Sequence, residues 1–170
     1  FLPQIKKLGL TLGGGGARGA AHVGALIELE KLGVQPDMVT GTSIGGLIGA
    51  LYAAGLSGKE MAQFFADLNI SNVFRLPSGS PAMTSNEGFR KLLQKAIGNV
   101  QFSHLATPLA VVAVDLKTRK EVILDRGSVI TAVLATCAIP VALPPVELDN
   151  MLLVDGGLIN NTPFDVTRAR

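Results

Sequence analysis

The segment GTSIGG, residues 41–46, decides how this chain folds. It lies between two apolar runs, and the pattern predicts a short strand over residues 38–40 and a buried helix over residues 44–54. Gly41, Ser43 and Gly45 form G-x-S-x-G between these elements, which is the context of a nucleophile elbow. In such a turn the serine adopts a strained backbone conformation, and flanking side chains would clash. A tight turn without chemistry is the alternative interpretation, so the rest of the chain must decide.

A second glycine-rich segment, GGGGARG at residues 13–19, precedes this elbow. Gly14, Gly16 and Gly19 form G-x-G-x-x-G between a strand predicted over residues 8–12 and a helix predicted over residues 20–32, as in dinucleotide-binding folds. Those folds also place an acidic residue at the end of the second strand, but Asp37 comes before that strand. The chain has no Gly-Lys-Ser/Thr either, which excludes a P-loop. A nucleotide is therefore not expected as a partner.

What remains for this glycine loop is a turn at the start of a helix. Backbone amides without neighbouring Cβ atoms can approach a ligand closely, and a helix N-terminus favours negative charge. The loop therefore suits a bound phosphate or a developing oxyanion. A tight turn that only allows close packing of strand and helix is the alternative.

A serine nucleophile needs a base, and the histidines are badly placed for one. The α/β-hydrolase order is serine, acid, histidine, but His22 and His104 both precede Asp155. Asp155 follows a strand predicted over residues 151–154, at the carboxyl end where α/β sheets hold their ligands. Within about 3 Å of Ser43 its carboxylate would serve directly as the base. An ordinary Asp-Gly turn is the alternative.

The remaining pattern predicts one α/β domain over residues 1–170 around a largely parallel sheet. Residues 69–86 are rich in Pro, Ser, Gly and Asn and are predicted to be a long loop. The other predicted elements are helices over residues 58–68, 87–97 and 129–137, strands over residues 109–114 and 121–124, and the start of a helix from residue 161.

Composition excludes several classes of function. Apolar residues make up 48% of the chain and charged residues 16%, as in a globular protein, and the net charge of +2 does not indicate a nucleic-acid partner. A single cysteine, Cys137, allows no intrachain disulfide. Residues 38–56 carry no charge over 19 positions, but five glycines and Ser43 favour a strand, a turn and a helix over a membrane span. No signal peptide is visible, so a cytoplasmic or peripherally membrane-associated location is expected.

Three motifs in this order and spacing, GGGGARG, GTSIGG and DGG at residues 155–157, resemble the patatin-like phospholipases, particularly the bacterial members. The resemblance runs from about Lys7 to the C-terminus and includes CAIPVALPPVEL and DGGLINNTPFDV. It implies a three-layer α/β/α domain. Family members continue beyond the position of Arg170 through a helix into another strand, so the resemblance implies that this C-terminal part is missing here.

The resemblance also implies a serine–aspartate dyad without histidine. Ser43 would be the nucleophile and Asp155 its base, and backbone amides of the glycine loop would form the oxyanion hole. The substrate would be a fatty acyl ester of a phospholipid or related lipid at a membrane surface, cleaved without metal or cofactor. The oxyanion-hole residues implied are Gly14, Gly15, Gly16 and Arg18, and the remaining motif positions are Gly19, Gly41, Gly45, Gly156 and Gly157.

Two other classes of function remain as alternatives. A non-catalytic module of the same fold would bind lipid or phosphate through the glycine loop, and it would require neither the elbow serine nor Asp155. A nucleotide-dependent oxidoreductase is the second alternative, but this chain lacks the acidic residue at the end of the second strand that such an enzyme needs. The sequence leaves the acyl chain, the head group, the distinction between phospholipase, lysophospholipase and esterase, and the oligomeric state open.

Overall fold

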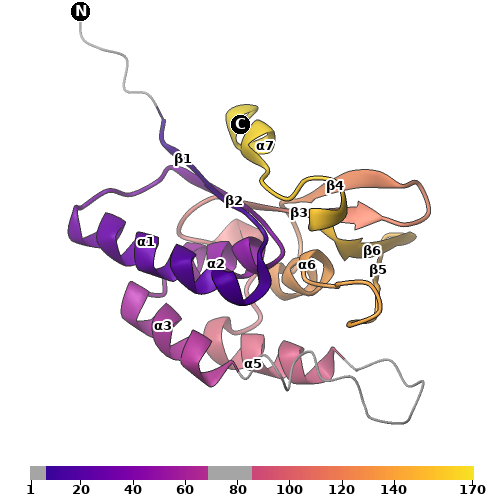
Figure 1. The fold of residues 1–170 in the computed structure, drawn as a ribbon, viewed down its shortest axis with the longest axis horizontal. Helices are drawn as coiled ribbons and strands as arrows, with labels where there is room; N and C mark the ends of the chain where they lie inside the picture. Colours follow the sequence, from indigo (N-terminus) through magenta and orange to yellow (C-terminus); the bar gives the residue numbers. More distant parts are fainter. Residues whose placement is uncertain (1–6, 69–85) are drawn as a thin grey trace, which may run out of the picture.

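The structure is a computed structural model that describes residues 7–68 and 86–170. A six-stranded sheet crosses the described part of the chain, in the order β1-β2-β3-β6-β5 with β4 also paired to β3. Helices lie on both faces of this sheet (Figure 1). The strands are β1 (Gly9–Leu12), β2 (Met38–Thr42), β3 (Leu109–Asp115), β4 (Lys120–Leu124), β5 (Val146–Leu148) and β6 (Met151–Asp155).

The sheet is mixed. β1, β2 and β3 are mutually parallel, whereas β4 and β6 both run antiparallel to β3. β5 is antiparallel to β6 and so runs in the same direction as the first three strands. Four of the six strands thus share one direction, which confirms the predicted α/β fold. The two reversed strands arise from the hairpins β3–β4 and β5–β6.

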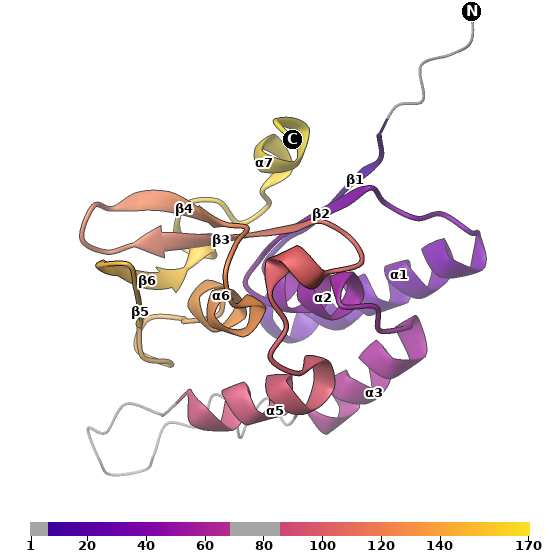
Figure 2. The same cartoon turned by 180° about the vertical axis from the view of Figure 1, so that it is seen from behind.

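The helices form an inner and an outer layer on one face of the sheet. α2 and α6 pack directly on the strands, and α3 and α5 lie outside them (Figures 1 and 2). α7 covers β1 and β2 on the opposite face. The α-helices are α1 (Ala20–Lys31), α2 (Ile44–Ala53), α3 (Gly58–Asp67), α5 (Glu87–Ile97), α6 (Val129–Thr136) and α7 (Phe164–Arg168), and the 3₁₀ helices are η1 (Gly16–Gly19), η2 (Phe102–His104) and η3 (Gly156–Leu158).

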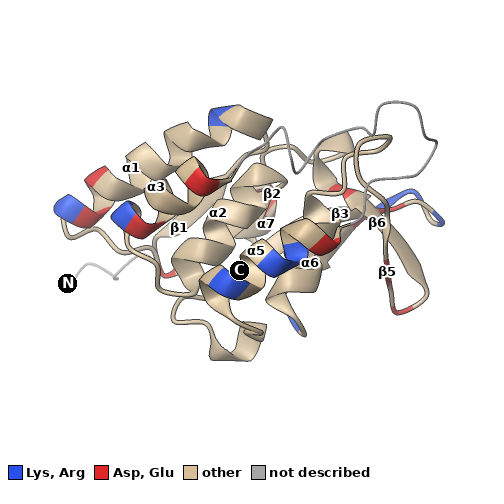
Figure 3. Ribbon diagram, turned by 90° about the horizontal axis from the view of Figure 1, so that it is seen from below, with Lys and Arg blue, Asp and Glu red and all other residues tan. Residues whose placement is uncertain are grey.

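The composition of each helix explains its layer. α2 and α6 contain no charged residue, and every residue of α2 except Tyr52 is buried. α3 and α5 both carry charged residues (Figure 3). Phe64 and Leu93 are among the few residues that they bury. A helix that is apolar on all sides belongs inside the molecule, whereas an amphipathic helix covers a core.

β2 shows why the strand alternates small or apolar residues with threonines. Val39 and Gly41 face α2, where Val39 lies against Gly49. Thr40 and Thr42 face the opposite side, because the Thr40 hydroxyl donates to the carbonyl of Pro163 and the Thr42 hydroxyl to that of Asn160. The period of two thus separates a hydrogen-bonded face from a face packed on the helix.

Most predicted elements are present with small shifts at their ends. The helix over residues 87–97 matches α5, and the strand predicted over residues 38–40 extends to Thr42. The helix predicted from residue 161 begins at Phe164. β5 was not predicted; it pairs with β6 across a two-residue turn in which Asp149 and Asn150 have φ values of 46° and 64°. The loop predicted over residues 69–86 lies outside the described residues, apart from Asn86.

Candidate active site at the meeting of two strands

Ser43 occupies the turn between β2 and α2, with φ 55° and ψ −126°. A residue with a side chain rarely adopts positive φ, so the backbone is strained there. The flanking glycines permit this turn. A Cβ on Gly41 would lie 2.5 Å from the carbonyl carbon of Gly45, and a Cβ on Gly45 would lie 2.1 Å from the carbonyl oxygen of Leu12. The G-x-S-x-G pattern is therefore a steric requirement of this turn.

Strand pairing brings Asp155 to this serine. Thr42, at the end of β2, pairs with Val112, and Asp155, at the end of β6, pairs with the next residue of β3, Ala113. β4 pairs with both of these β3 residues, so it occupies the other edge of β3. β2 and β6 therefore share one edge, and their carboxyl ends meet. Asp155 was predicted to lie at a strand end by the rule for parallel sheets, but β6 runs antiparallel to β3 and reaches this point from the opposite direction.

The two side chains form a short hydrogen bond. Ser43 Oγ donates to Asp155 Oδ2 at 2.6 Å, and the amide of Gly157 donates to Asp155 Oδ1 at 2.7 Å. Both side chains are nearly covered, with 8% of Ser43 and 7% of Asp155 exposed. Burial raises the pKa of Asp155, and the hydrogen bonds from Ser43 and Gly157 oppose this effect. A carboxylate oxygen thus accepts a hydrogen bond from the serine hydroxyl.

The backbone of Ser43 is held by a residue that the sequence analysis missed. The amide of Ser43 donates to Thr136 Oγ1 at 2.8 Å, and that hydroxyl donates to the carbonyl of Val112. Thr136 is fully buried at the end of α6. The sequence offers one indication of this role: Thr136 is a polar residue in a mainly apolar helix, and a polar side chain that is buried needs a hydrogen-bond partner. The Ser43 amide is therefore not free for a ligand.

The glycine loop lies beside Ser43. A Cβ on Gly14 would stand 3.3 Å from Ser43 Cβ and 2.4 Å from Asn161 Oδ1, so a side chain at this position would displace the side chain of Asn161. The amide of Gly14 donates to the carbonyl of Asn161 at 2.9 Å. The amides of Gly15 and Gly16 have no hydrogen-bond partner among residues 7–68 and 86–170. Of the four residues that the resemblance implied for an oxyanion hole, Gly15 and Gly16 therefore have unoccupied amides, whereas the amides of Gly14 and Arg18 are both bonded.

Arg18 and the remaining motif glycines lie close to the same centre. The Arg18 amide donates to the carbonyl of Gly15 at 3.2 Å, and its Nε lies 3.9 Å from the point where a Cβ on Gly15 would stand. A Cβ on Gly19 would come within 2.3 Å of Ile44 Cγ1. A Cβ on Gly156 would come equally close to the carbonyl of Val112, and one on Gly157 would lie 3.0 Å from Asp155 Oδ1.

Among the described residues, neither histidine hydrogen-bonds to Ser43 or Asp155. His22 Nε2 lies 2.8 Å from the carbonyl oxygen of Gly13, to which it donates. His104 lies in η2, before the start of β3. The first residue of β3, Leu109, pairs with Val39 near the start of β2, whereas Ser43 follows the end of β2. Cys137 is buried close to Asp155, and burial together with the charge of Asp155 raises the pKa of its thiol well above the usual range. The thiolate that a cysteine nucleophile requires is therefore disfavoured.

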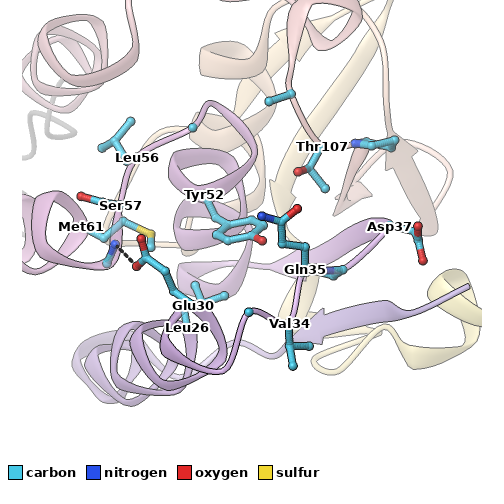
Figure 4. A pocket seen from close by; sticks show the side chains of 16 residues that line it. Leu26, Glu30, Val34, Gln35, Asp37, Tyr52, Leu56, Ser57, Met61 and Thr107 are labelled. Carbon is cyan, nitrogen blue, oxygen red and sulfur yellow. Dashed lines mark hydrogen bonds between the residues drawn. The ribbon is translucent and has the colours of Figure 1, made fainter.

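A cleft elsewhere on the molecule is separate from this centre. It has a volume of about 650 Å³ and lies between the loop before β2, the end of α2 and the start of α3 (Figure 4). Glu30 and Tyr52 line it, and the Glu30 carboxylate accepts a hydrogen bond from the amide of Gly58 at 3.1 Å. Ser43 directly precedes α2, and this cleft lies at the other end of the helix, about 15 Å away for ten residues.

Neither a metal centre nor a spanning helix is found among the residues that the structure describes. Residues 7–68 and 86–170 contain no cluster of three or more His, Cys, Asp or Glu side chains suited to a metal ion. None of the helices in these two ranges has the length and apolar character to cross a bilayer.

Comparison with known sequences assigns the chain to a family. The patatin-like phospholipase profile matches residues 10–168. An uncharacterized NTE family protein of Mycobacterium tuberculosis is 39% identical over 168 residues, which are 96% of this chain and 28% of that protein. The human patatin-like phospholipase domain-containing protein 6 is 36% identical over 170 residues, 95% of this chain and 12% of that protein. The chain belongs to the patatin-like phospholipase family, and it spans less than a third of these relatives.

Comparison with solved structures shows the same fold. VipD from Legionella pneumophila superposes with a TM-score of 0.74 over 91% of this chain and 46% of VipD, at 16% sequence identity. The type III effector ExoU superposes with a TM-score of 0.57 over 77% of this chain and 40% of ExoU, at 18% identity.

Proposed function

We propose that the chain is a serine lipid acyl hydrolase in which Ser43 is the nucleophile and Asp155 is its base. The hydrogen bond of 2.6 Å from Ser43 Oγ to Asp155 Oδ2, made at a strained elbow, carries this proposal. A structural turn would need neither the positive φ of a serine nor a buried carboxylate aimed at its hydroxyl. Membership of the patatin-like phospholipase family supports the same reaction.

The proposed reaction proceeds through an acyl-enzyme. Ser43 Oγ attacks the ester carbonyl while Asp155 Oδ2 accepts its proton, and the negative charge develops on the carbonyl oxygen. The unoccupied amides of Gly15 and Gly16 and the N-terminus of α2 supply the positive end of backbone dipoles to that oxygen. Asp155 then protonates the leaving alcohol. In the second half, Asp155 accepts a proton from the water that attacks the acyl carbonyl. Asp155 then returns this proton to Ser43 Oγ as the bond from Oγ to the acyl group breaks and the fatty acid leaves.

A lipid ester is the proposed class of substrate. The family bears the name of phospholipases, and a Drosophila relative that is 34% identical over 173 residues is named neuropathy target esterase. Leu158 and Ile159, which follow the Asp155 turn in the sequence, have 58% and 53% of their surface exposed, and exposed apolar side chains suit contact with acyl chains. We propose that the substrate is met at a membrane surface.

Fatty acid release tests the proposal. Purified chain is assayed with a short-chain aryl ester and with phosphatidylcholine vesicles, and compared with Ser43→Ala and Ser103→Ala. Ser103 is an exposed serine in η2 and serves as the matched control. Turnover that is lost in Ser43→Ala and kept in Ser103→Ala supports a serine hydrolase. Turnover that persists in Ser43→Ala refutes the nucleophile. Absence of turnover in a folded wild-type chain that still binds the vesicles favours the non-catalytic module.

A further inference from the structure

Asn161 touches both loops that flank the serine–aspartate pair. Its carbonyl accepts the amide of Gly14 at 2.9 Å, and its side-chain Nδ2 lies 3.4 Å from the carbonyl oxygen of Gly14. Its Oδ1 lies 3.0 Å from the point where a Cβ on Gly157 would stand, as does Asp155 Oδ1. A single asparagine therefore joins the glycine loop to the turn that follows Asp155.

The segment that carries Asn161 is itself anchored at the site. The hydroxyl of Thr42, the residue before Ser43, donates to the carbonyl of Asn160 at 2.8 Å. The amide of Asn160 donates to the carbonyl of Gly156 at 2.9 Å. Asn161 is thus tied through the backbone to the neighbours of both Ser43 and Asp155, although its own side chain is exposed.

The contact of Asn161 with the Gly14 carbonyl affects the amide of the next residue, because both belong to one peptide plane. In a planar trans peptide the carbonyl and the following amide point in opposite directions. The contact of Asn161 with the Gly14 carbonyl therefore sets the direction of the Gly15 amide, one of the two unoccupied donors. His22 holds the carbonyl of Gly13 on the preceding peptide plane in the same way, at 2.8 Å.

We propose that Asn161 is a positioning residue that orients the Gly14–Gly15 peptide so that the Gly15 amide faces the oxyanion of the reaction. This inference rests on the proposed function. Asn161 acts through its side-chain amide and holds the loop through its carbonyl. Asn161 therefore contributes to stabilisation of the transition state and does not affect binding of the ground-state ester.

Three variants test this role by separating kcat from KM on a short-chain aryl ester. Asn161→Ala removes the donor, and we expect kcat to fall about tenfold to a hundredfold with KM within about twofold, because a misaligned oxyanion donor weakens the transition state. Asn161→Asp is nearly isosteric but sets a negative charge beside the Gly14 carbonyl and the oxyanion, so its kcat should fall further. Asn160→Ala is the matched control, because within residues 7–68 and 86–170 the Asn160 side chain donates only to Asp165, at 2.9 Å.

Backbone ¹⁵N relaxation gives a readout that does not depend on turnover. The order parameters of Gly14, Gly15 and Gly16 should fall in Asn161→Ala and stay at the wild-type level in Asn160→Ala. Wild-type order parameters in Asn161→Ala, or a kcat equal to that of Asn160→Ala in an active enzyme, would overturn the inference. A wild-type chain without turnover would defeat the proposed function, and the relaxation data would still decide whether Asn161 orders the loop.

Discussion

Ser43 and Asp155 meet along one edge of β3, because Thr42, the residue before Ser43, pairs with Val112 and Asp155 pairs with the next residue, Ala113. Their contact therefore depends on sheet hydrogen bonds more than on loop conformation. β2 and β6 arrive from opposite directions and end where they meet, which leaves the two side chains facing each other at 2.6 Å. A pair held by three neighbouring strands is preorganised, and an enzyme gains most from groups that need not move during the reaction.

Replacing Asp155 by Asn should lower the activity and raise the stability of the fold. We expect kcat to fall by about 10²-fold to 10⁴-fold, because a general base is lost. Burial raises the pKa of Asp155, so its charged form is disfavoured by folding at neutral pH. The neutral amide removes this cost, and the unfolding temperature of Asp155→Asn at pH 7 should exceed that of the wild type. The gain should shrink in acid, where Asp155 is protonated. An unfolding temperature at pH 7 equal to or below that of the wild type would contradict this view.

The same pKa shift predicts the acid limb of the pH–rate profile. Asp155 works as a base only when deprotonated, so kcat/KM should fall as the pH drops through its raised pKa. The midpoint should lie above the ordinary aspartate value of about 3.9. Rates are measured between pH 3.5 and 8, with circular dichroism at each pH to verify that the chain stays folded. A midpoint at or below the ordinary value would exclude a buried carboxylate as the titrating base.

Two glycine substitutions separate close packing from helix propensity. Gly45→Ala places a Cβ 2.1 Å from the Leu12 carbonyl and should destabilise the fold by about 1–3 kcal/mol, because α2 cannot retreat from β1 without strain. Gly24→Ala, in the exposed part of α1, has no atom within 4 Å of the new Cβ. It should stabilise the helix by about 0.5–1 kcal/mol. Urea denaturation of both variants measures the difference, and equal effects would refute the steric account of the elbow.

Asp115 predicts a separate loss of stability in acid. The amide of Leu152 and the backbone and hydroxyl of Thr118 donate to its carboxylate, together with the amide of Lys117, and they lower its pKa to about 2. A depressed folded-state pKa contributes stability above the unfolded value of about 3.9, and this contribution is lost as the pH falls towards 2.

The test for Asp115 is a comparison of unfolding temperatures against pH. Asp115→Asn should be clearly less stable than the wild type at pH 7, and the two should converge between pH 4 and pH 2. Asp149→Asn, in the turn of the neighbouring β5–β6 hairpin, is the control and should follow the wild type, because asparagine suits a turn position with positive φ. A constant difference between Asp115→Asn and the wild type at all pH values would argue against a charge effect.

Local motifs could be predicted from the sequence because their causes are local. The glycines around Ser43 and the apolar run of α2 follow from sterics and burial within one strand–turn–helix unit. β5 was missed because it has only three residues after two prolines, although Asp149-Asn150 is a suitable pair for a tight hairpin turn.

Contacts between distant segments could not be predicted in the same way. Thr136 holds the Ser43 amide from α6, 93 residues away, and Asn161 holds the amide of Gly14 across 147 residues. The sequence around Thr136 and Asn161 contains no pattern that predicts which residue each of them contacts. The antiparallel arrival of β6 is likewise a property of the whole sheet, so the site of Asp155 was predicted correctly at a strand end but for a reason that applies to parallel strands.

The most direct measurement is the covalent state of Ser43 during reaction. The chain is mixed with a short-chain aryl ester and quenched in acid within milliseconds, and the acylated peptide is located by mass spectrometry in the wild type, Ser43→Ala and Asp155→Asn. We expect one acyl group for each wild-type chain, on Ser43, with none in Ser43→Ala and a much slower rise in Asp155→Asn. Turnover without an adduct on Ser43, or acylation of Asp155→Asn at the wild-type rate, would contradict the serine–aspartate mechanism.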